Sequence, residues 1–352
     1  MSEGCGHTCR CMHDPASAPR GGLMVQTNAP SVLPRFRVLF NEDDTREDVF
    51  RVDAGQIDEL RALLPMLSEI ERGSIRAVPI CDAGQHDPWD AAPIADVLLR
   101  LETEWLTDAM SEDAMRFHYQ PIVDAYHLRT FANEALVRTS IGDAPLSPAD
   151  LLQAAKAHNA LLTLDQRMRS RAITSSAEYL QGGGLLFVNF IPATIYDPEV
   201  CLRTTFRAAQ SVGVGLDRVV FEIVESEAFP DVDHLRRIVD AHRARGAGVA
   251  LDDLGAGNTA LLFIDTLHPD YIKIDRELLR RSVESNETAL FTGIVRHAQD
   301  RGIRVIAEGI ENEQQLDFCR ELGVQYAQGY HIARPAADPV RVDSDLRQNS
   351  AA

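Results

Sequence analysis

Carboxylate, amide and lysine side chains close most of the short apolar runs that follow residue 117. The series consists of Glu134, Asn189, Glu222, Glu225, Asp252, Asp253, Lys273, Glu308 and Gln328. Oxygen-bearing side chains that gathered at one place would repel one another unless a cation lay among them. If the fold brings these residues together, the pattern predicts a metal-dependent enzyme.

The elements that carry these residues alternate between strand-like runs and stretches with helical periodicity. Such alternation predicts an α/β fold, here a TIM-like (β/α)8 barrel over residues 108–340, in which all strand ends open onto one face. The first two strands, 117–124 and 129–139, are separated by only four residues. That connection is too short for a helix, so we expect an antiparallel first strand pair.

The region before the barrel has a different character. Residues 1–33 are rich in Gly, Pro, Ala and Ser, and they predict a disordered tail. Residues 34–107 predict a small α/β region with a regulatory, capping or dimerising role and an unidentified regulatory partner. We expect strands at 35–40 and 75–80, a helix at 57–73 interrupted at Pro65, and a helix from residue 94. Residues 341–352 predict a second disordered tail.

The bulk properties exclude some classes of function. The 352 residues carry a net charge of −18, which argues against DNA binding because nucleic-acid surfaces need basic footprints. No apolar run approaches the roughly 20 residues that cross a bilayer, so we expect no membrane span. The N-terminus lacks the pattern of a secretory signal, and a cytoplasmic location is the expectation.

Cysteine and histidine residues cluster near the N-terminus, at Cys5, His7, Cys9, Cys11 and His13. They could bind a metal or take part in redox chemistry. However, the ligands crowd into nine positions with no second arm to close a tetrahedral site, which favours a tail without a metal.

Several of the acidic positions have a structural alternative. Glu134 either pairs with Arg138 or binds a metal, and Asn189 either caps the next helix or completes an oxygen site. Asp252 and Asp253 either form a turn or point into the barrel mouth, where two adjacent carboxylates need a cation. Glu222 and Glu225 lie three apart, so on a strand only one of them can face the mouth.

Lys273 stands out because the chain contains 33 arginines and only two lysines. A lysine can give up its proton when its environment is tuned, whereas an arginine cannot. The alternative is a structural pair with Asp275 or Glu308. Together with the acidic residues and the Gln328 amide, Lys273 fits a two-ion site for in-line displacement at phosphorus.

The order of the motifs resembles the EAL-domain family of bacterial cyclic dimeric GMP phosphodiesterases. The resemblance spans about 230 residues and rests on eight segments: Y-Q-P-I-V-D at 119–124, E-A-L-V-R at 134–138, F-V-N at 187–189, F-E-I-V-E at 221–225, L-D-D-L-G-A-G at 251–257, Y-I-K-I-D at 271–275, A-E-G-I-E at 307–311 and Q-G-Y at 328–330. It implies Mg²⁺- or Mn²⁺-dependent hydrolysis of cyclic di-GMP to linear pGpG, and a homodimer that forms through the barrel.

The resemblance also implies a role for each matching residue. Glu134, Asn189, Glu222 and Asp252 correspond to ligands of a first metal ion, and Asp252, Asp253 and Glu308 to ligands of a second. Lys273, Glu308 and Gln328 correspond to catalytic positions, and Glu225 to a residue that stabilises the loop after the paired aspartates. The substrate-binding positions implied are Gln120, Leu136, Arg138, Asp275, Glu311 and Tyr330.

The chain departs from the family at that loop. It reads D-D-L-G-A-G-N-T-A at 252–260, where the family usually has D-D-F-G-T-G-Y-S-S. The departure supports an alternative function, in which a catalytically weak EAL domain acts as a cyclic di-GMP receptor or a protein-interaction module. A third hypothesis is an aldolase that uses Lys273 to form a Schiff base. The ring of acidic residues argues against it.

Overall fold

The computed structural model describes residues 22–44, 46–80, 91–111, 113–142, 144–224, 231–255, 260–285 and 287–341. The chain forms two compact units. Within the described ranges, the first unit contains residues 22–111 and 141–161, and the second contains 113–140 and 162–341. The second unit carries the predicted site residues that the structure describes.

The first unit alternates short strands and helices. Its elements are β1 (Leu23–Thr27), α1 (Leu33–Leu39), β2 (Asn41–Asp43), β3 (Arg46–Val52), α2 (Ile57–Leu63), α3 (Glu69–Gly73), β4 (Ile75–Pro79), β5 (Ala92–Pro93), α4 (Ile94–Glu102), α5 (Leu106–Ala109), β8 (Ala144–Leu146) and α6 (Pro148–Ala157), with 3₁₀ turns at Ala54–Gln56 and Leu64–Met66.

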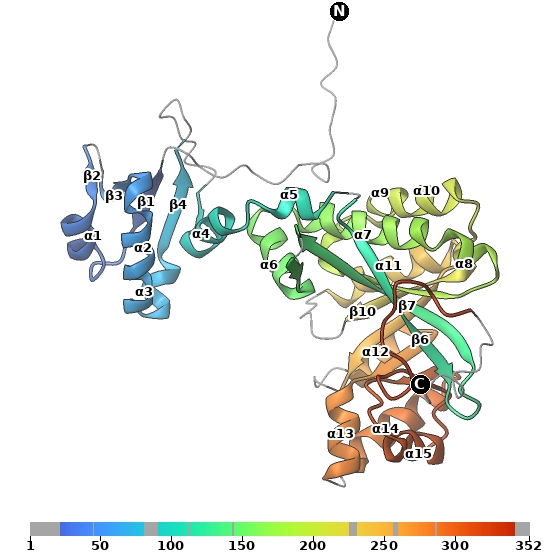
Figure 1. Ribbon diagram of the computed structural model, residues 1–352. Helices are drawn as coiled ribbons and strands as arrows, with labels where there is room; N and C mark the ends of the chain where they lie inside the picture. The colour runs from blue at the N-terminus through green and yellow to red at the C-terminus, as the bar shows by residue number, and fades with distance from the viewer. Residues whose placement is uncertain are drawn as a thin grey trace, which may run out of the picture. The chain divides into compact units, whose positions relative to one another are not determined.

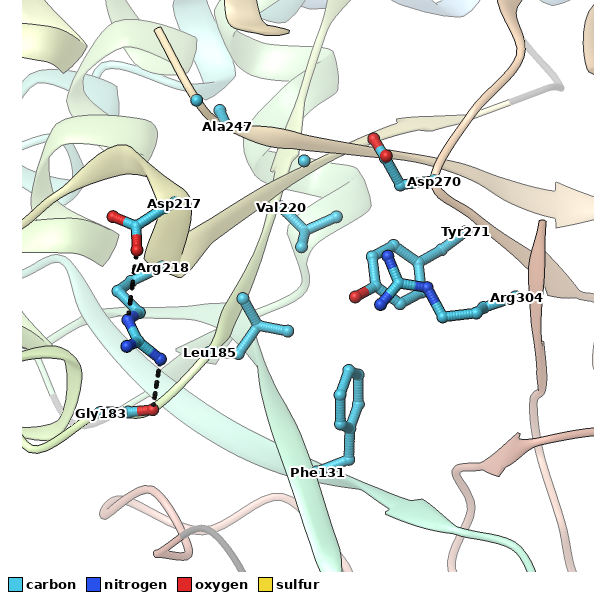
Figure 2. Close-up of a pocket in the computed structure, with 12 residues that line it drawn as sticks. Phe131, Gly183, Leu185, Asp217, Arg218, Val220, Ala247, Asp270, Tyr271 and Arg304 are labelled. Atoms are coloured by element: carbon cyan, nitrogen blue, oxygen red, sulfur yellow. Dashed lines mark hydrogen bonds and ion pairs between the residues drawn. The ribbon is translucent and has the colours of Figure 1, made fainter. Parts of the chain in front are cut away.

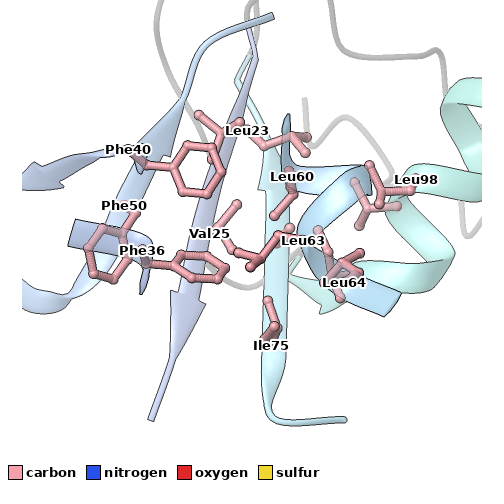
Figure 3. Close-up of a cluster of buried hydrophobic side chains, with 14 of the residues drawn as sticks. Leu23, Val25, Phe36, Phe40, Phe50, Leu60, Leu63, Leu64, Ile75 and Leu98 are labelled. Carbon is pink, nitrogen blue, oxygen red and sulfur yellow. The ribbon is translucent and has the colours of Figure 1, made fainter. Parts of the chain in front are cut away.

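The sheet of this unit has the strand order β2-β3-β1-β4-β5, and its neighbours are antiparallel. That order, with α1 after β1 and α2 after β3, is a ferredoxin-like arrangement of two split β-α-β units. Figure 3 shows the core, where the Phe36 ring meets the rings of Phe40 and Phe50 with centroids 5.2 Å and 5.3 Å apart.

Two predictions for this region were wrong. The tail was expected to reach residue 33, but residues 23–27 form β1, the central strand of the sheet. Residues 35–40 were expected to be a strand, yet they lie mostly in helix α1. Phe36 and Phe40 are four residues apart, so one helical face can bury both rings. The helix break at Pro65 and the strand at 75–80 were predicted correctly.

The second unit contains the elements of a barrel. They are β6 (Arg116–Asp124), β7 (Thr130–Ile141), α7 (Leu161–Ser175), α8 (Ala177–Gln181), β9 (Leu186–Phe190), α9 (Pro198–Cys201), α10 (Arg203–Ser211), β10 (Val219–Val224), α11 (Val232–Arg243), β11 (Gly248–Leu254), α12 (Ala260–Leu267), β12 (Tyr271–Ile274), α13 (Arg276–Glu284), α14 (Thr288–Gln299), β13 (Arg304–Ala307), α15 (Glu313–Glu321) and β14 (Tyr326–Ala327), with 3₁₀ turns at Pro192–Thr194 and Leu216–Arg218.

Eight strands of this unit close on themselves within the described residues, in the order β6-β14-β13-β12-β11-β10-β9-β7, with β7 returning to β6. The neighbours are parallel except at β6, which is antiparallel to both β7 and β14. The predicted TIM-like barrel with an antiparallel first pair is therefore confirmed. Figure 1 shows the helices of this unit packed around the strands.

The strand register places the predicted residues side by side. Glu134 on β7 pairs with Gln120 on β6, and Glu222 on β10 pairs with Asn189 on β9. Because the seven barrel strands other than β6 share one direction, their carboxyl ends form a single rim. Among the helices that the structure describes, none is both long and apolar enough to span a membrane.

Candidate active site

Lys273 lies at the centre of the carboxyl-terminal rim, on β12. Its Nζ is 2.6 Å from Glu308 Oε1, 2.8 Å from Glu222 Oε1, 3.2 Å from Asp252 Oδ1 and 3.4 Å from Glu134 Oε2. The side chain is only 1% exposed. A single buried ammonium group therefore faces four carboxylates that come from four different strands or strand ends. Lys273 does not pair with Asp275, which was one structural alternative. It does pair with Glu308, the other alternative, but Glu308 is one of four carboxylate partners.

The carboxylates fall into two groups that share one member. Single oxygens of Glu134, Glu222 and Asp252 lie within 4.8 Å of one another, and so do oxygens of Asp252, Asp253 and Glu308. These are the two sets predicted as metal ligands, apart from Asn189. The resemblance implied that Asp252 belongs to both sets, and the geometry brings it into both.

Two amides hold the Glu134 carboxylate from either side. Asn189 Nδ2 donates to Oε1 at 2.9 Å, and Gln328 Nε2 donates to Oε2 at 2.8 Å. Gln328 Nε2 also lies 3.3 Å from Gln120 Oε1. Glu134 thus contacts amides and Lys273, and the pairing with Arg138 is not formed; an Arg138 guanidinium nitrogen donates instead to the backbone oxygen of Val137 at 2.8 Å.

The buried oxygens of Glu222 give a direct test of whether the site suits a cation. Both oxygens are inaccessible; Oε1 lies 2.8 Å from Lys273 Nζ, and Oε2 accepts no hydrogen bond from any residue that the structure describes. Buried carboxylates are costly unless they are paired or bind a metal. Several oxygen donors around such a carboxylate are the ligand type that Mg²⁺ and Mn²⁺ prefer, so the residues fit divalent ions.

The pKa shifts of the rim residues also indicate a site that suits cations. Burial, followed by the charge of neighbouring carboxylates, raises the pKa of Glu222 and of Glu308 well above the usual value. Burial next to Asp252 raises the pKa of Asp253 to about 6. Burial lowers the tendency of Lys273 to be charged, but the surrounding carboxylates outweigh it and raise its pKa. The raised pKa values mean that these carboxyl groups hold protons more readily than usual. A bound cation would take the place of such protons, because it favours the ionised carboxylates.

Asp253 has an unusual backbone. Its φ is +58°, in the left-handed region that residues other than glycine rarely adopt, and its backbone N–H donates to Asp252 Oδ1 at 2.9 Å. Strained backbones often persist where surrounding structure fixes a functional side chain. Both aspartates lie within β11, at a point where its register with β12 shifts, so the structural alternative of a turn is not formed. The irregular strand brings an oxygen of each aspartate close to one of Glu308.

A buried ion pair that the sequence analysis missed supports the loop after Asn189. Asp165 on α7 accepts hydrogen bonds from the backbone N–H of Ile191 at 2.9 Å and from Thr194 Oγ1 at 2.8 Å. Arg169 Nε donates to the same carboxylate at 3.0 Å, and its guanidinium also contacts the Thr205 hydroxyl. Asp165 and Arg169 are both fully buried. Their spacing of four within an otherwise apolar helix face is the signal that could have revealed them.

The predicted substrate-binding residues lie on barrel strands or shortly after them. Asp275 accepts a hydrogen bond from the backbone N–H of Glu277 at 2.9 Å and so caps α13, and Glu311 lies 3.6 Å from Arg276. Tyr330 is 58% exposed beneath the guanidinium of Arg334. Leu136 is half-buried on β7. Their roles remain predictions.

Some predictions fall outside the described residues. These are Glu225, the N-terminal Cys and His cluster, and most of the altered loop, 256–259. At the start of that loop Leu254 is fully buried, so the residue that departs from the usual aromatic packs into the barrel unit.

Comparisons with known proteins give one family and one fold. The model of the EAL domain matches residues 103–335. Over 242 residues the chain is 26% identical to the bifunctional diguanylate cyclase/cyclic di-GMP phosphodiesterase MucR of Pseudomonas aeruginosa. That alignment covers 65% of this chain and 34% of MucR, so the chain spans about a third of the length of this relative.

Two solved structures are also similar. One is a standalone EAL protein from Vibrio cholerae with c-di-GMP bound, at 28% identity and a TM-score of 0.58, covering 66% of this chain and 97% of that one. The other is BlrP1 of Klebsiella pneumoniae in a complex with manganese and cyclic di-GMP, at 25% identity and a TM-score of 0.58. It covers 70% of this chain and 68% of that one.

Proposed function

The chain belongs to the EAL-domain family, and from this premise we propose that it hydrolyses cyclic di-GMP to linear pGpG in a reaction that depends on divalent metal ions. One phosphodiester bond is cleaved. The oxygen of water adds to one phosphorus atom, the bond from that phosphorus to its 3′ oxygen breaks, and the 3′ oxygen takes up a proton.

The observation that carries this proposal is the position of Lys273 among four carboxylates that form two groups with Asp252 in common. A structural salt bridge needs one carboxylate. A set this acidic, buried at the carboxyl-terminal rim of a barrel, is instead suited to hold cations beside a phosphate.

Glu134, Asn189, Glu222 and Asp252 would hold one ion, and Asp252, Asp253 and Glu308 would hold the other, as Mg²⁺ or Mn²⁺. For the first ion the Asn189 amide would turn its oxygen inward, because its nitrogen now donates to Glu134. When bound, a pair of such ions supplies the acidity that activates the attacking water for in-line displacement and offsets charge on the leaving oxygen.

The protein's own groups do the rest. Lys273, whose pKa is raised by the carboxylates, stays protonated and compensates the negative charge that develops at the phosphate. Gln328 fixes the orientation of Glu134 through its N–H, and its carbonyl oxygen is buried and accepts no hydrogen bond from the described residues, so it is free to orient a water. Glu308 completes the catalytic set beside Lys273.

We further propose that substrate contacts come from Gln120, Leu136, Arg138, Asp275, Glu311 and Tyr330, and that Glu225 stabilises the loop after Asp253. A homodimer through the barrel, a cytoplasmic location and an unidentified regulatory partner of the first unit complete the proposal. The charge of −18 makes a DNA partner unfavourable.

The test is incubation of the purified full chain with cyclic di-GMP and Mn²⁺, with the products resolved by chromatography. Conversion to pGpG supports the proposal. Binding of cyclic di-GMP without turnover would replace it with the receptor function that the altered loop favours. If the protein neither binds nor hydrolyses cyclic di-GMP, the proposal is wrong and a protein-interaction function is favoured instead.

A further inference from the structure

Figure 2 shows a pocket of about 510 Å³. The positions of its lining residues along the strands place it at the end of the barrel opposite the rim that carries Lys273. Gly248, Tyr271 and Arg304, which line it, are the first residues of β11, β12 and β13. Lys273 lies two residues after Tyr271 on the same strand, and side chains of a buried apolar cluster fill the barrel around Tyr271. The pocket is therefore distinct from the proposed active site.

Aromatic rings form one wall of the pocket. The Arg304 guanidinium lies over the ring of Tyr271, 3.8 Å from its centroid. The Phe131 ring stacks on Tyr326, with centroids 4.0 Å apart and planes 22° apart. In Figure 2 the Phe131 ring and the Tyr271–Arg304 pair face the same central space. A flat guanidinium on a ring offers its outer face to a second flat group, so this wall suits a planar ligand.

The charges around the pocket are not balanced. Asp217 is matched by Arg218, whose Nε lies 3.5 Å away. Asp270 accepts a hydrogen bond from the backbone N–H of Val249 at 2.9 Å and lies 3.8 Å from Arg243 Nε. Arg304 is exposed, and no carboxylate of the described chain lies within 4.0 Å of its guanidinium nitrogens.

The lining carries two arginines and two aspartates, but both aspartates lie near another arginine, Asp217 near Arg218 and Asp270 near Arg243 from outside the lining. Arg304, on the aromatic wall, is therefore the lining cation without a carboxylate partner in the described chain. In a protein with a charge of −18, such a place attracts a ligand that is both flat and negatively charged. The volume is within the range of small-molecule sites, roughly 300–1,000 Å³.

From these observations we propose that the amino-terminal pocket of the barrel binds a planar aromatic anion of up to mononucleotide size, with its ring against Arg304 and Phe131 and its anionic group near the Arg304 and Arg218 guanidinium groups. A nucleoside monophosphate and a small aromatic carboxylate share this chemistry.

The test uses the full chain with labelled methyl groups and EDTA, which keeps divalent ions from recruiting the probe to the other end of the barrel. Guanosine monophosphate, 4-hydroxybenzoate, guanosine and inorganic phosphate are titrated separately. We expect guanosine monophosphate, 4-hydroxybenzoate or both to shift the methyl resonances of Leu185 and Val220 in a saturable way. Which of the two anions binds more tightly identifies the ligand class, a nucleoside monophosphate or an aromatic carboxylate. Guanosine and inorganic phosphate should each bind more weakly than the tighter of these anions.

Variants locate the site. Arg304→Gln should weaken binding about tenfold or more while leaving hydrolysis of cyclic di-GMP unchanged, because Arg304 does not touch the catalytic rim. Arg236→Gln, an exposed arginine on α11, is the matched control and should bind normally. Asp252→Asn should also bind normally.

Saturable binding that disappears in Asp252→Asn but survives in Arg304→Gln would overturn the proposal, as would unshifted Leu185 and Val220 methyls in the wild type with every probe at about 1 mM. Neither result would bear on the proposed hydrolysis, which is measured at the other end of the barrel.

Discussion

The Nζ of Lys273 and Oε1 of Glu308 are only 2.6 Å apart, at a point where Lys273 is almost inaccessible to solvent. This ion pair joins adjacent strands of the barrel. Because three further carboxylates also face the same ammonium group, Lys273 partly neutralises the rim in the absence of metal ions.

Substitution of this lysine tests both its roles. Lys273→Ala should reduce hydrolysis of cyclic di-GMP by about 10²-fold or more, because a charge that stabilises the developing negative charge is lost, yet leave nucleotide binding largely intact. Without metal, the variant should also unfold more easily, since carboxylates remain buried without their cation. Turnover and the free energy of unfolding are the two measurements.

The second lysine of the chain provides the control. Lys156 is exposed on α6, and Lys156→Ala should match the wild type in both measurements. Turnover by Lys273→Ala at the wild-type rate would remove this lysine from the reaction.

Metal removal is the next prediction. EDTA should stop hydrolysis, and added Mg²⁺ or Mn²⁺ should restore it. The same ions should stabilise the folded protein against heat, by about 2.7 kcal/mol at a concentration one hundred times the dissociation constant. Asp252→Asn should abolish this stabilisation for both ions at once, whereas Asp233→Asn, on the surface of α11, should not change it. Undiminished activity in metal-free buffer would contradict the two-ion proposal.

The buried pair of Asp165 and Arg169 gives a prediction about stability. Asp165→Asn leaves the Arg169 guanidinium buried without its counter-charge, which typically costs 3–5 kcal/mol. Replacement of both residues by apolar ones, Asp165→Leu with Arg169→Met, should cost less than the sum of the two single changes. Urea unfolding of the wild type, Asp165→Leu, Arg169→Met and the double variant measures this coupling. Strictly additive costs would show that the pair does not act as a unit.

The Asp165→Asn variant also tests whether the buried pair helps to position the proposed metal ligand Asn189. Because Asp165 accepts from the backbone of Ile191, two residues after Asn189, Asp165→Asn should weaken Mn²⁺ binding measured by calorimetry. The affinity for Mn²⁺ would be unchanged if the pair stabilised the fold alone.

His242 predicts how stability changes with pH. Its ring is buried against Phe221, with centroids 4.3 Å apart, its Nδ1 donates to the Ile238 carbonyl at 2.9 Å, and its Nε2 has no partner among the described residues. Burial lowers the pKa of His242 to about 3. The unfolded chain, with a pKa near 6.5, therefore binds a proton that the folded chain does not.

Between about pH 6.5 and pH 3 this difference destabilises the fold as the pH falls; by pH 5 it should amount to about 2 kcal/mol. His242→Leu removes the effect, so its free energy of unfolding relative to the wild type should improve progressively from pH 7 to pH 5. Parallel stability curves for the two proteins over that range would contradict the assignment. Carboxyl groups of the rim titrate in both proteins and cancel in the comparison.

The sequence predicted the barrel and its rim because each site residue follows an apolar strand of regular spacing. It could not predict that Lys273 would contact four carboxylates, since strand order and register decide which side chains meet. Asp165 and Arg169 were not predicted because they lie on helix α7, whereas the site was predicted from polar residues at strand ends.

The errors in the first unit have a physical cause as well. The segment at 35–40 alternates apolar and basic residues, R-F-R-V-L-F, which satisfies a strand period over a few positions. Pro34 at the start of α1 and the burial of Phe36 and Phe40 on one face favour the helix. Strand β1 was overlooked because its five residues follow a stretch rich in glycine and proline.

Asp252 contributes an oxygen to each of the two acidic groups. If ions bind as proposed, both positions depend on this one side chain, and a single codon change at Asp252 would empty them together while the barrel still folds. Under that proposal, one evolutionary step would be enough to separate the fold from its chemistry.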